Sequence, residues 1–235
     1  MLRPGPADGD YSGGFHRAVR LTLTIGALAV AALAGLSIAQ APHDHEHEFA
    51  DTERWTEVFD DPDRDAWQKP REVIKALALK PTSLVADVGA GTGYFTVRIA
   101  RVVRSGKVYA ADLEPQMVKH LEARAKREKL ANVVPVQAAL DDPRLPEPVD
   151  VALFVDVYHH IDDRRAYFEK LKRSLKPGGR VAVIDFTLDS EIGPPPRARV
   201  SPERVKSELA AAGYQLGDEL TFLPNQYFLV FTAQK

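Results

Sequence analysis

The feature that most constrains the fold of this 235-residue chain is a glycine-rich segment at 85–95. It begins with apolar and β-branched residues, as a buried parallel strand does, and then carries Gly89, Gly91 and Gly93 before a stretch of helical periodicity. Because glycine has no Cβ, the backbone there can adopt positive φ and approach a ligand closely. The helix that follows directs free N–H groups and its positive dipole end at the same place. The segment therefore predicts a strand, a tight loop and a helix that bind a nucleotide-like ligand.

The spacing of the glycines indicates which nucleotide is favoured. A dinucleotide fingerprint has the pattern G-x-G-x-x-G, with the third glycine under a pyrophosphate. Here the third glycine comes one residue early, and Tyr94 stands in its place. Asp87 lies in the strand end, where it would repel a pyrophosphate and attract a cationic or amino group. An NAD-linked oxidoreductase is therefore the less favoured alternative.

Asp87-x-Gly89-x-Gly91-x-Gly93 resembles the first motif of class I S-adenosylmethionine (SAM)-dependent methyltransferases. The resemblance covers about residues 51–235 and implies that the glycine loop, including Ala90, holds the amino-acid end of SAM. The alternative is a glycine turn of purely structural use. Apolar runs over 81–235 supply seven strands, with crossover helices up to the last pair. We expect an α/β fold: a doubly wound, mostly parallel seven-stranded sheet with N-terminal helices and an antiparallel C-terminal hairpin.

A second acidic residue, Asp112, ends the next expected strand at 107–111. In a doubly wound sheet this strand tip lies beside the first loop, where a carboxylate can accept two hydrogen bonds from a ribose diol. We assign Asp112 and its neighbour Leu113 to cofactor binding. Asp112 as the N-cap of the helix that begins near Glu114 is the alternative, and the two roles are compatible.

Two further acids are assigned to the cofactor. The resemblance implies that the segment 138–143 contacts adenine, and Asp141 is the candidate acid there. A nearly continuous apolar run at 149–155 predicts a central strand buried on both faces. This strand delivers Asp156 to the edge of the sheet where ligands bind.

Tyr158, His159 and His160 follow at the same edge and are the candidate catalytic residues. Imidazole titrates near neutral pH and suits a general base. Alternatively the three side chains line the pocket or bind backbone, because in-line positioning alone can drive methyl transfer. The His-His pair resembles small-molecule methyltransferases, and the Asn/Asp-Pro-Pro-Tyr/Phe signature of nucleic-acid amino methyltransferases is absent.

The C-terminal third contains two loops of interest. Lys176 to Gly179 predicts a turn that ends a helix, before a fifth strand at 180–186. The Pro-rich segment 187–200 is expected to be a substrate lid, or else a plain surface connection. A last helix is expected from Ser201 and Pro202 onward.

The first fifty residues predict an export signal. Arg17 and Arg20 precede a charge-free apolar stretch at 21–38 that ends in small residues, with cleavage expected after Ala39. An uncleaved membrane tether through 21–38 is the alternative. Both interpretations place the catalytic domain outside the cytoplasm. The domain would then be periplasmic, secreted or anchored to the membrane. We expect residues 1–39 to be the signal peptide or anchor, 40–50 a His- and acid-rich linker, and 51–235 the methyltransferase domain.

The amino-acid composition narrows the classes of function that remain. The chain has no cysteine, which excludes disulfides and thiol nucleophiles, and its net charge of −2 gives no broad attraction for nucleic acid. His43 to His47 alternate with acids and could hold a metal loosely, but a solvated linker is favoured and no metal site is assigned. We expect in-line methyl transfer from SAM to an unidentified small-molecule acceptor. A SAM-binding module without turnover is the alternative from another class.

Overall fold

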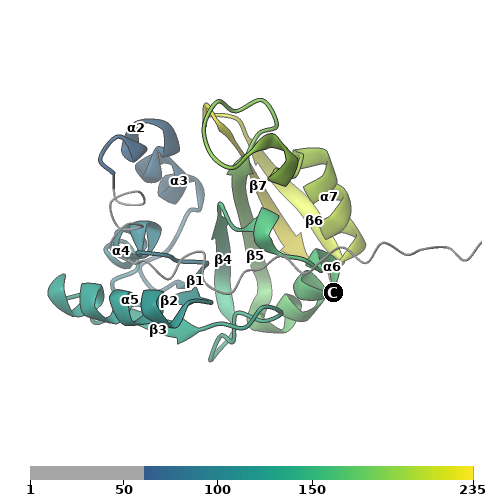
Figure 1. The fold of residues 1–235 in the computed structure, drawn as a ribbon. Coiled ribbons are helices and arrows are strands. Elements are labelled where there is room, and N and C mark those ends of the chain that lie inside the picture. Colours follow the sequence, from purple (N-terminus) through teal and green to yellow (C-terminus); the bar gives the residue numbers. More distant parts are fainter. Residues whose placement is uncertain (1–60, 235) are drawn as a thin grey trace, which may run out of the picture. The chain divides into compact units, whose positions relative to one another are not determined.

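A computed structural model describes residues 61–234. In them a seven-stranded sheet has the order β3-β2-β1-β4-β5-β7-β6. The first five strands pair in parallel, and β7 runs antiparallel between β5 and β6. The strands are β1 Leu84–Val88, β2 Lys107–Asp112, β3 Val133–Gln137, β4 Val149–Val155, β5 Leu175–Phe186, β6 Tyr214–Leu220 and β7 Gln226–Ala233. The expected α/β fold with a C-terminal antiparallel hairpin is confirmed (Figure 1).

Helices cover both faces of this sheet. Apolar side chains of α3, α4 and α5 form one core with the sheet, and those of α6 and α7 form the core on the opposite face. The α-helices are α2 Arg64–Gln68, α3 Pro70–Ala76, α4 Tyr94–Ala100, α5 Pro115–Arg127, α6 Arg164–Leu171 and α7 Pro202–Ala211. Short 3-10 helices are η1 Tyr158–His160, η2 Lys172–Ser174 and η3 Pro196–Ala198. Figure 1 shows α5 and α7 on opposite sides of the sheet.

Local sequence explains where several elements begin. The Ser201 side chain accepts a hydrogen bond from Arg204 N, and Pro202 occupies the first turn of α7, so this helix starts where the sequence predicts. The Asp163 side chain caps α6 in the same way through Ala166 N. Strand β4 is buried along nearly its whole length, as its continuous apolar run predicts.

The predicted turn at 176–179 differs from the structure. Helix α6 ends at Leu171, and β5 already begins at Leu175. Leu175 pairs with Val149 and Arg180 pairs with Val151, so the intervening residues form a bulge inside the strand. The apolar Leu175 side chain is buried against the sheet and extends the ladder ahead of the glycines, of which Gly178 adopts a φ of 77°.

The predicted signal peptide or anchor, the linker and its histidines, and the start of the 51–235 domain lie outside the described residues and stay predictions. Between residues 61 and 234, no helix is both long and apolar enough to cross a membrane. The same residues contain no group of three or more His, Cys, Asp or Glu placed to hold a metal ion.

The strand order locates the ligand edge of the sheet. From β1 the chain proceeds outward to β2 and β3, and then returns to the other side of β1 with β4 and β5. In open α/β sheets, ligands bind outside the carboxyl ends of the strands where the order reverses, which here lies between β1 and β4.

Candidate active site

The glycine loop joins β1 to α4 in a conformation that side chains disfavour. Gly89, Gly91 and Gly93 have φ values of 69°, 54° and 91°. A Cβ on Gly89 would lie 2.3 Å from Val157 Cγ2, and one on Gly93 would lie 2.8 Å from Leu121 Cδ2. The glycines are therefore needed for backbone conformation and for close packing against the turn after β4 and against α5.

The N–H groups of this loop are already used within the protein. Gly89 N and Ala90 N donate to Ala111 O, at 2.8 and 3.1 Å, and Gly93 N donates to Ala90 O at 2.9 Å. Gly91 N donates to Asp112 Oδ2 at 2.7 Å. A loop whose donors are bonded in this way is poorly suited to cradle a pyrophosphate, which needs free N–H groups.

Two buried carboxylates flank the loop instead. Asp87 accepts a hydrogen bond from Thr96 Oγ1 at 2.6 Å, and burial raises its pKa to about 6. Asp112 accepts from Gly91 N and from Glu114 N, and burial raises its pKa despite these bonds. The carboxylate of Asp112 thus binds the loop and the turn before α5 together. The N-cap of α5 is Glu114, so the alternative of Asp112 as the N-cap is wrong, and its cofactor role stays a prediction. Among the predicted cofactor residues, the structure brings Asp87, the glycines and Asp112 together.

A second polar group lies at the ends of β4 and β5, around the half-buried Asp156. Asp156 has a φ of 59°, rare for a residue with a side chain, and its carboxylate accepts hydrogen bonds from the amides of Gln226 and Gln68. Arg64 Nη2 lies 3.7 Å from Asp156 Oδ2. Burial, and next the charge of Asp185, raise the pKa of Asp156 against the opposing effect of Arg64. The structure therefore places Asp156 in a network with α2 and β7.

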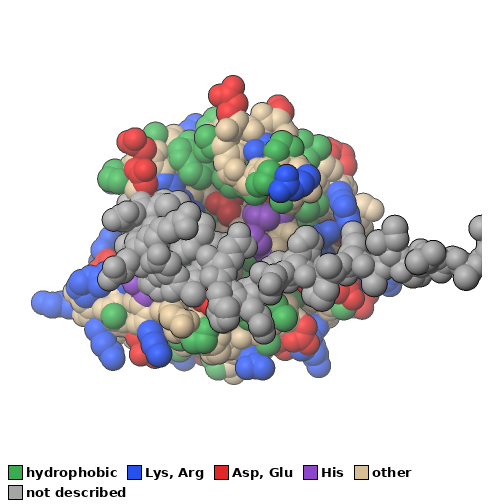
Figure 2. Space-filling model, in the orientation of Figure 1, with side chains coloured by type: hydrophobic (Ala, Val, Ile, Leu, Met, Phe, Trp, Pro, Cys, Tyr) green, Lys and Arg blue, Asp and Glu red, His purple; other side chains and the backbone are tan. Residues whose placement is uncertain are grey.

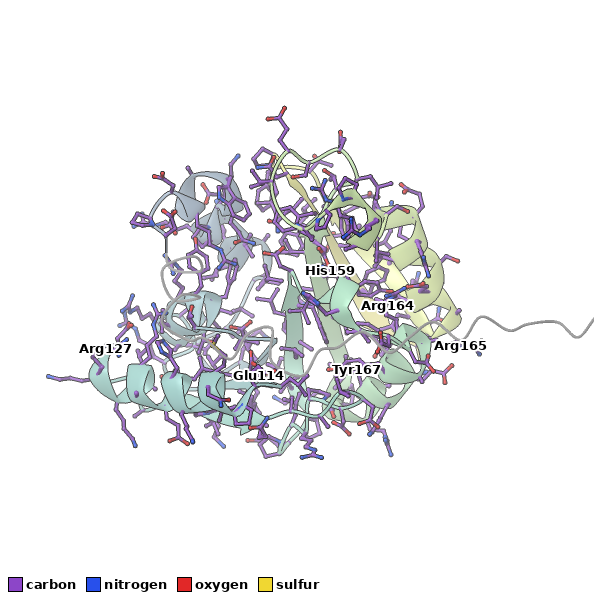
Figure 3. All side chains as sticks on the ribbon, in the orientation of Figure 1. Glu114, Arg127, His159, Arg164, Arg165 and Tyr167 are labelled. Carbon is purple, nitrogen blue, oxygen red and sulfur yellow. The ribbon has the colours of Figure 1, made fainter. Side chains whose placement is uncertain are left out.

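His159 forms a close pair with Asp185. The ring Nδ1 lies 2.9 and 3.0 Å from the two carboxylate oxygens, which also accept from His159 N and Phe186 N. Asp185 is buried at 1% exposure. Figure 3 shows His159 on η1, beside the ends of β4 and β5, and Figure 2 shows histidine side chains on the same face of the molecule.

The other predicted catalytic residues are placed differently. Tyr158 is fully buried, its hydroxyl donates to Glu208 at 2.7 Å, and burial with this bond raises its pKa. This hydroxyl is therefore poorly placed for proton transfer at the sheet edge. His160 lies beside His159, with 4.1 Å between the ring centroids.

Two predicted cofactor residues lie at the rim of the edge. Asp141 is 75% exposed and pairs with Lys170 at 2.8 Å, and this hydrogen bond lowers its pKa. Leu113 is partly exposed directly after Asp112. No contact within residues 61–234 draws Asp141 toward the glycine loop, and its adenine role stays a prediction.

Sequence reasoning missed Asp185, Gln226, Gln68 and Arg64 as parts of the site. The signal for Asp185 was available, because it is a lone acid near the end of an apolar strand, like Asp87 and Asp112. Gln68, Gln226 and Arg64 carry no comparable pattern, since they reach Asp156 only through the folding of distant segments.

The loop 187–200 continues from β5 beside this network. The Arg199 guanidinium donates hydrogen bonds to backbone carbonyls of the same loop: Thr187, Leu188, Ser190, Ile192 and Pro194. Gly193 packs against the ring of Phe186, where a Cβ would lie 2.7 Å away. One half-buried cationic side chain thus holds the loop in shape.

Residues 85–179 match the family model of a methyltransferase domain. This segment holds the glycine loop, both carboxylates beside it and His159. The methyltransferase match thus covers most of the sheet edge just described.

Similar proteins and structures agree with this match. An uncharacterised methyltransferase of Mycobacterium tuberculosis is 34% identical over 53% of this chain and 48% of its own length. A ubiquinone/menaquinone biosynthesis C-methyltransferase of Marinomonas sp. is 32% identical over 50% of this chain and 48% of its own. A crystal structure of a SAM-dependent methyltransferase from Aquifex aeolicus superimposes with a TM-score of 0.73, at 28% identity, over 78% of this chain and 99% of that one.

These likenesses support the expected enzyme class, a SAM-dependent methyltransferase, with SAM as its cofactor. The chain spans about half the length of the curated relatives it matches.

Proposed function

We propose that this chain transfers a methyl group from SAM to a small-molecule acceptor. The observation that carries the proposal is the loop between β1 and α4, whose N–H groups are bonded within the protein while two buried carboxylates flank it. Such a site favours a ligand that carries donors and positive charge. SAM has both, in a ribose diol, an ammonium group and a sulfonium.

The residues present fit this cofactor. A carboxylate has about four lone-pair positions, and Asp112 uses two of them for Gly91 N and Glu114 N. The others are left for the hydroxyls of a ribose. Asp87 supplies negative charge at the end of β1, and the exposed side chain of Leu113 offers an apolar contact. When bound, SAM supplies an electrophilic methyl group on its sulfonium, and the protein supplies position and exclusion of water.

Calorimetry with SAM and with its demethylated product tests the proposal. We expect Asp112→Ala to weaken SAM binding by roughly tenfold or more, because hydrogen bonds to a charged group contribute about 1.5–3 kcal/mol. Asp112→Asn should weaken it too, while its side-chain oxygen still accepts from Gly91 N. Asp141→Ala is the matched control, an exposed acid that pairs with Lys170, and should change binding less.

Three results would count against parts of this proposal. Equal losses in Asp112→Ala and Asp141→Ala would remove the ribose assignment. Binding of NADH, seen by its fluorescence, in place of SAM would favour the oxidoreductase. SAM binding with no turnover on any acceptor would favour the binding module, because a fold does not by itself fix a reaction.

A further inference from the structure

A cavity of about 830 Å³ lies among the helices on one face of the sheet. Its lining comes from α2, α3, α4, the turns that follow α3 and α4, and the C-terminal end of α5. Figure 1 shows α3, α4 and α5 on the same side of the sheet. The volume is within the range of about 300–1,000 Å³ that is usual for small-molecule sites. None of the residues assigned above to the cofactor or to catalysis lines this cavity, so it is separate from the ligand edge.

The cavity combines an apolar wall with an excess of positive charge. Four large apolar side chains form part of the wall: Ile74, Leu79, Val97 and Val102. Val102 is 39% exposed, so a bound molecule would remove apolar surface from water there. The cationic side chains that line the cavity are Arg71, Lys75, Arg98, Arg101 and Arg124, and the acidic ones are Asp65 and Glu128. Three positive charges are therefore in excess.

The two acids already pair with the more enclosed cations. Asp65 accepts a hydrogen bond from Arg98 at 2.8 Å. Glu128 accepts one from Arg101 at 2.7 Å and one from Arg124 at 2.9 Å. These pairs hold the guanidinium groups in place at the cavity, but they leave no acid of the lining for the remaining two cations.

The remaining cations are Arg71 and Lys75, which lie one turn apart on α3. Both are exposed, and within residues 61–234 neither side chain has a hydrogen bond or an ion pair. An Arg and a Lys at this spacing project from the same side of a helix, so one anionic group can contact both. Their charges are therefore available to a ligand in the cavity.

We propose that this cavity is a second binding site, which takes a phosphate ester with an apolar body. The planar guanidinium group matches the oxygens of a phosphate with two parallel hydrogen bonds, and the ammonium group of a lysine adds a point charge. A phosphate monoester carries a charge of about −1.5 to −2 at pH 7, which offsets most of the positive excess. The apolar body covers the wall formed by Val97, Val102 and their neighbours. The proposal does not depend on methyl transfer, because the site shares no assigned residue with the ligand edge.

Calorimetry with simple probes tests both parts of this chemistry on the full chain. Hexyl phosphate should bind at one site, and inorganic phosphate should bind about tenfold or more weakly because it lacks the apolar body. Hexanol and hexylamine should show no binding, since neither carries negative charge. The affinity for hexyl phosphate should fall as the salt concentration rises, because exposed charges are screened.

Two double variants separate this site from general attraction between charges. Arg71→Gln with Lys75→Gln should weaken hexyl phosphate binding by about tenfold or more. Lys119→Gln with Arg127→Gln is the matched control, because it removes the same charge from exposed positions of α5 that do not line the cavity, and should change binding by less than about threefold. Val102→Ser should weaken hexyl phosphate and leave inorganic phosphate unaltered. Urea denaturation should show that all three variants fold.

A lipid head group and a soluble ester offer the same chemistry, and sedimentation with vesicles tells them apart. Binding to vesicles of phosphatidylglycerol in phosphatidylcholine that is lost in the Arg71 and Lys75 double variant would assign a lipid source. Binding of hexyl phosphate without sedimentation would assign a soluble ester.

Four results would overturn the proposal. They are no binding of hexyl phosphate by the folded protein, equal losses in the two double variants, inorganic phosphate binding as tight as that of hexyl phosphate, and binding of hexylamine at the same site. A failure to bind SAM would bear on the proposed function alone and would leave this site as it stands.

Discussion

The two halves of the sheet edge are built by different means. The half at β1 and β2 comes from one continuous segment, Asp87 to Asp112, and is held by backbone conformation and loop hydrogen bonds. The half at β4 and β5 collects side chains from α2, η1, β5 and β7 around two carboxylates, the buried Asp185 and the half-buried Asp156. The first should therefore respond most to changes of backbone, and the second to changes of charge and side-chain contacts.

The largest effect should come from Gly89→Ala. The residue has a φ of 69°, and its new Cβ would lie 2.3 Å from Val157 Cγ2. Left-handed conformation costs about 1–2 kcal/mol and overpacking about 1–3 kcal/mol more. We expect the free energy of unfolding to fall by roughly 2–5 kcal/mol in urea denaturation, with loss of SAM binding.

Gly178→Ala is the matched control, since its φ is 77° but nothing lies within 4 Å of its added Cβ. Gly178→Ala should lower the free energy of unfolding only by the cost of the left-handed backbone, about 1–2 kcal/mol. Adding Val157→Ala to Gly89→Ala should restore part of the unfolding free energy that the clash with the Val157 side chain removes. If Gly89→Ala and Gly178→Ala lower the free energy of unfolding equally, the close packing of Gly89 against Val157 does not contribute to stability.

A smaller effect, of opposite sign, is expected for Asp87→Asn. The folded state raises the pKa of Asp87 to about 6, so between its ordinary pKa and about 6 the folded protein binds this proton more tightly than the unfolded chain does. The free energy of unfolding therefore falls as pH rises from the ordinary pKa of Asp87 to about 6, and the loss reaches up to about 3 kcal/mol at pH 7. Asparagine cannot ionise and still accepts from Thr96, so the variant should be more stable at pH 7 and bind SAM more weakly.

Urea denaturation from about pH 4 to about pH 7 measures this difference. The unfolding free energies of the two proteins should nearly coincide at the acidic end and diverge toward neutral pH. A constant offset across the range would mean that Asp87 does not carry the ionisation cost.

The smallest effect on global stability is expected for Arg199→Ala, on the β5 side. Its guanidinium binds five carbonyls, all within the loop 187–200. We expect cleavage in this loop by limited proteolysis to become several times faster, while the unfolding free energy changes by less than about 1 kcal/mol. Arg197→Ala, an exposed change two residues away, should leave the cleavage rate unaltered. Slower or unchanged cleavage in Arg199→Ala would contradict the local role of these bonds.

The sequence predicted the fold and the first half of the edge because their signals are local. Apolar runs of strand length mark β1 to β5, and the three glycines with Asp87 mark the loop within a single segment. Asp112 could be added because one crossover unit fixes where the next strand ends. The extension of β5 back to Leu175 was missed because the pairing with Val149 is decided by the neighbouring strand.

The second half could be predicted only in part, for a physical reason. His159 was found because it follows a buried strand directly, but its partner Asp185 lies at the end of another strand. Gln68 and Gln226 are ordinary polar residues in sequence, and they become important only because folding places both amides on one desolvated carboxylate. Tyr158 was predicted together with the histidines, yet a 3-10 turn directs it into the core toward Glu208.

The contact of α2 with Asp156 has a practical consequence for shortening the protein. A fragment that starts at β1 would retain all seven strands, but its Asp156 would lose the amide of Gln68 and the guanidinium of Arg64, which also stacks on Tyr94. A half-buried carboxylate that loses such partners is less stable in its ionised form. Any trimmed version for crystallisation should therefore keep this short helix, although it contributes no strand and no residue to the glycine loop.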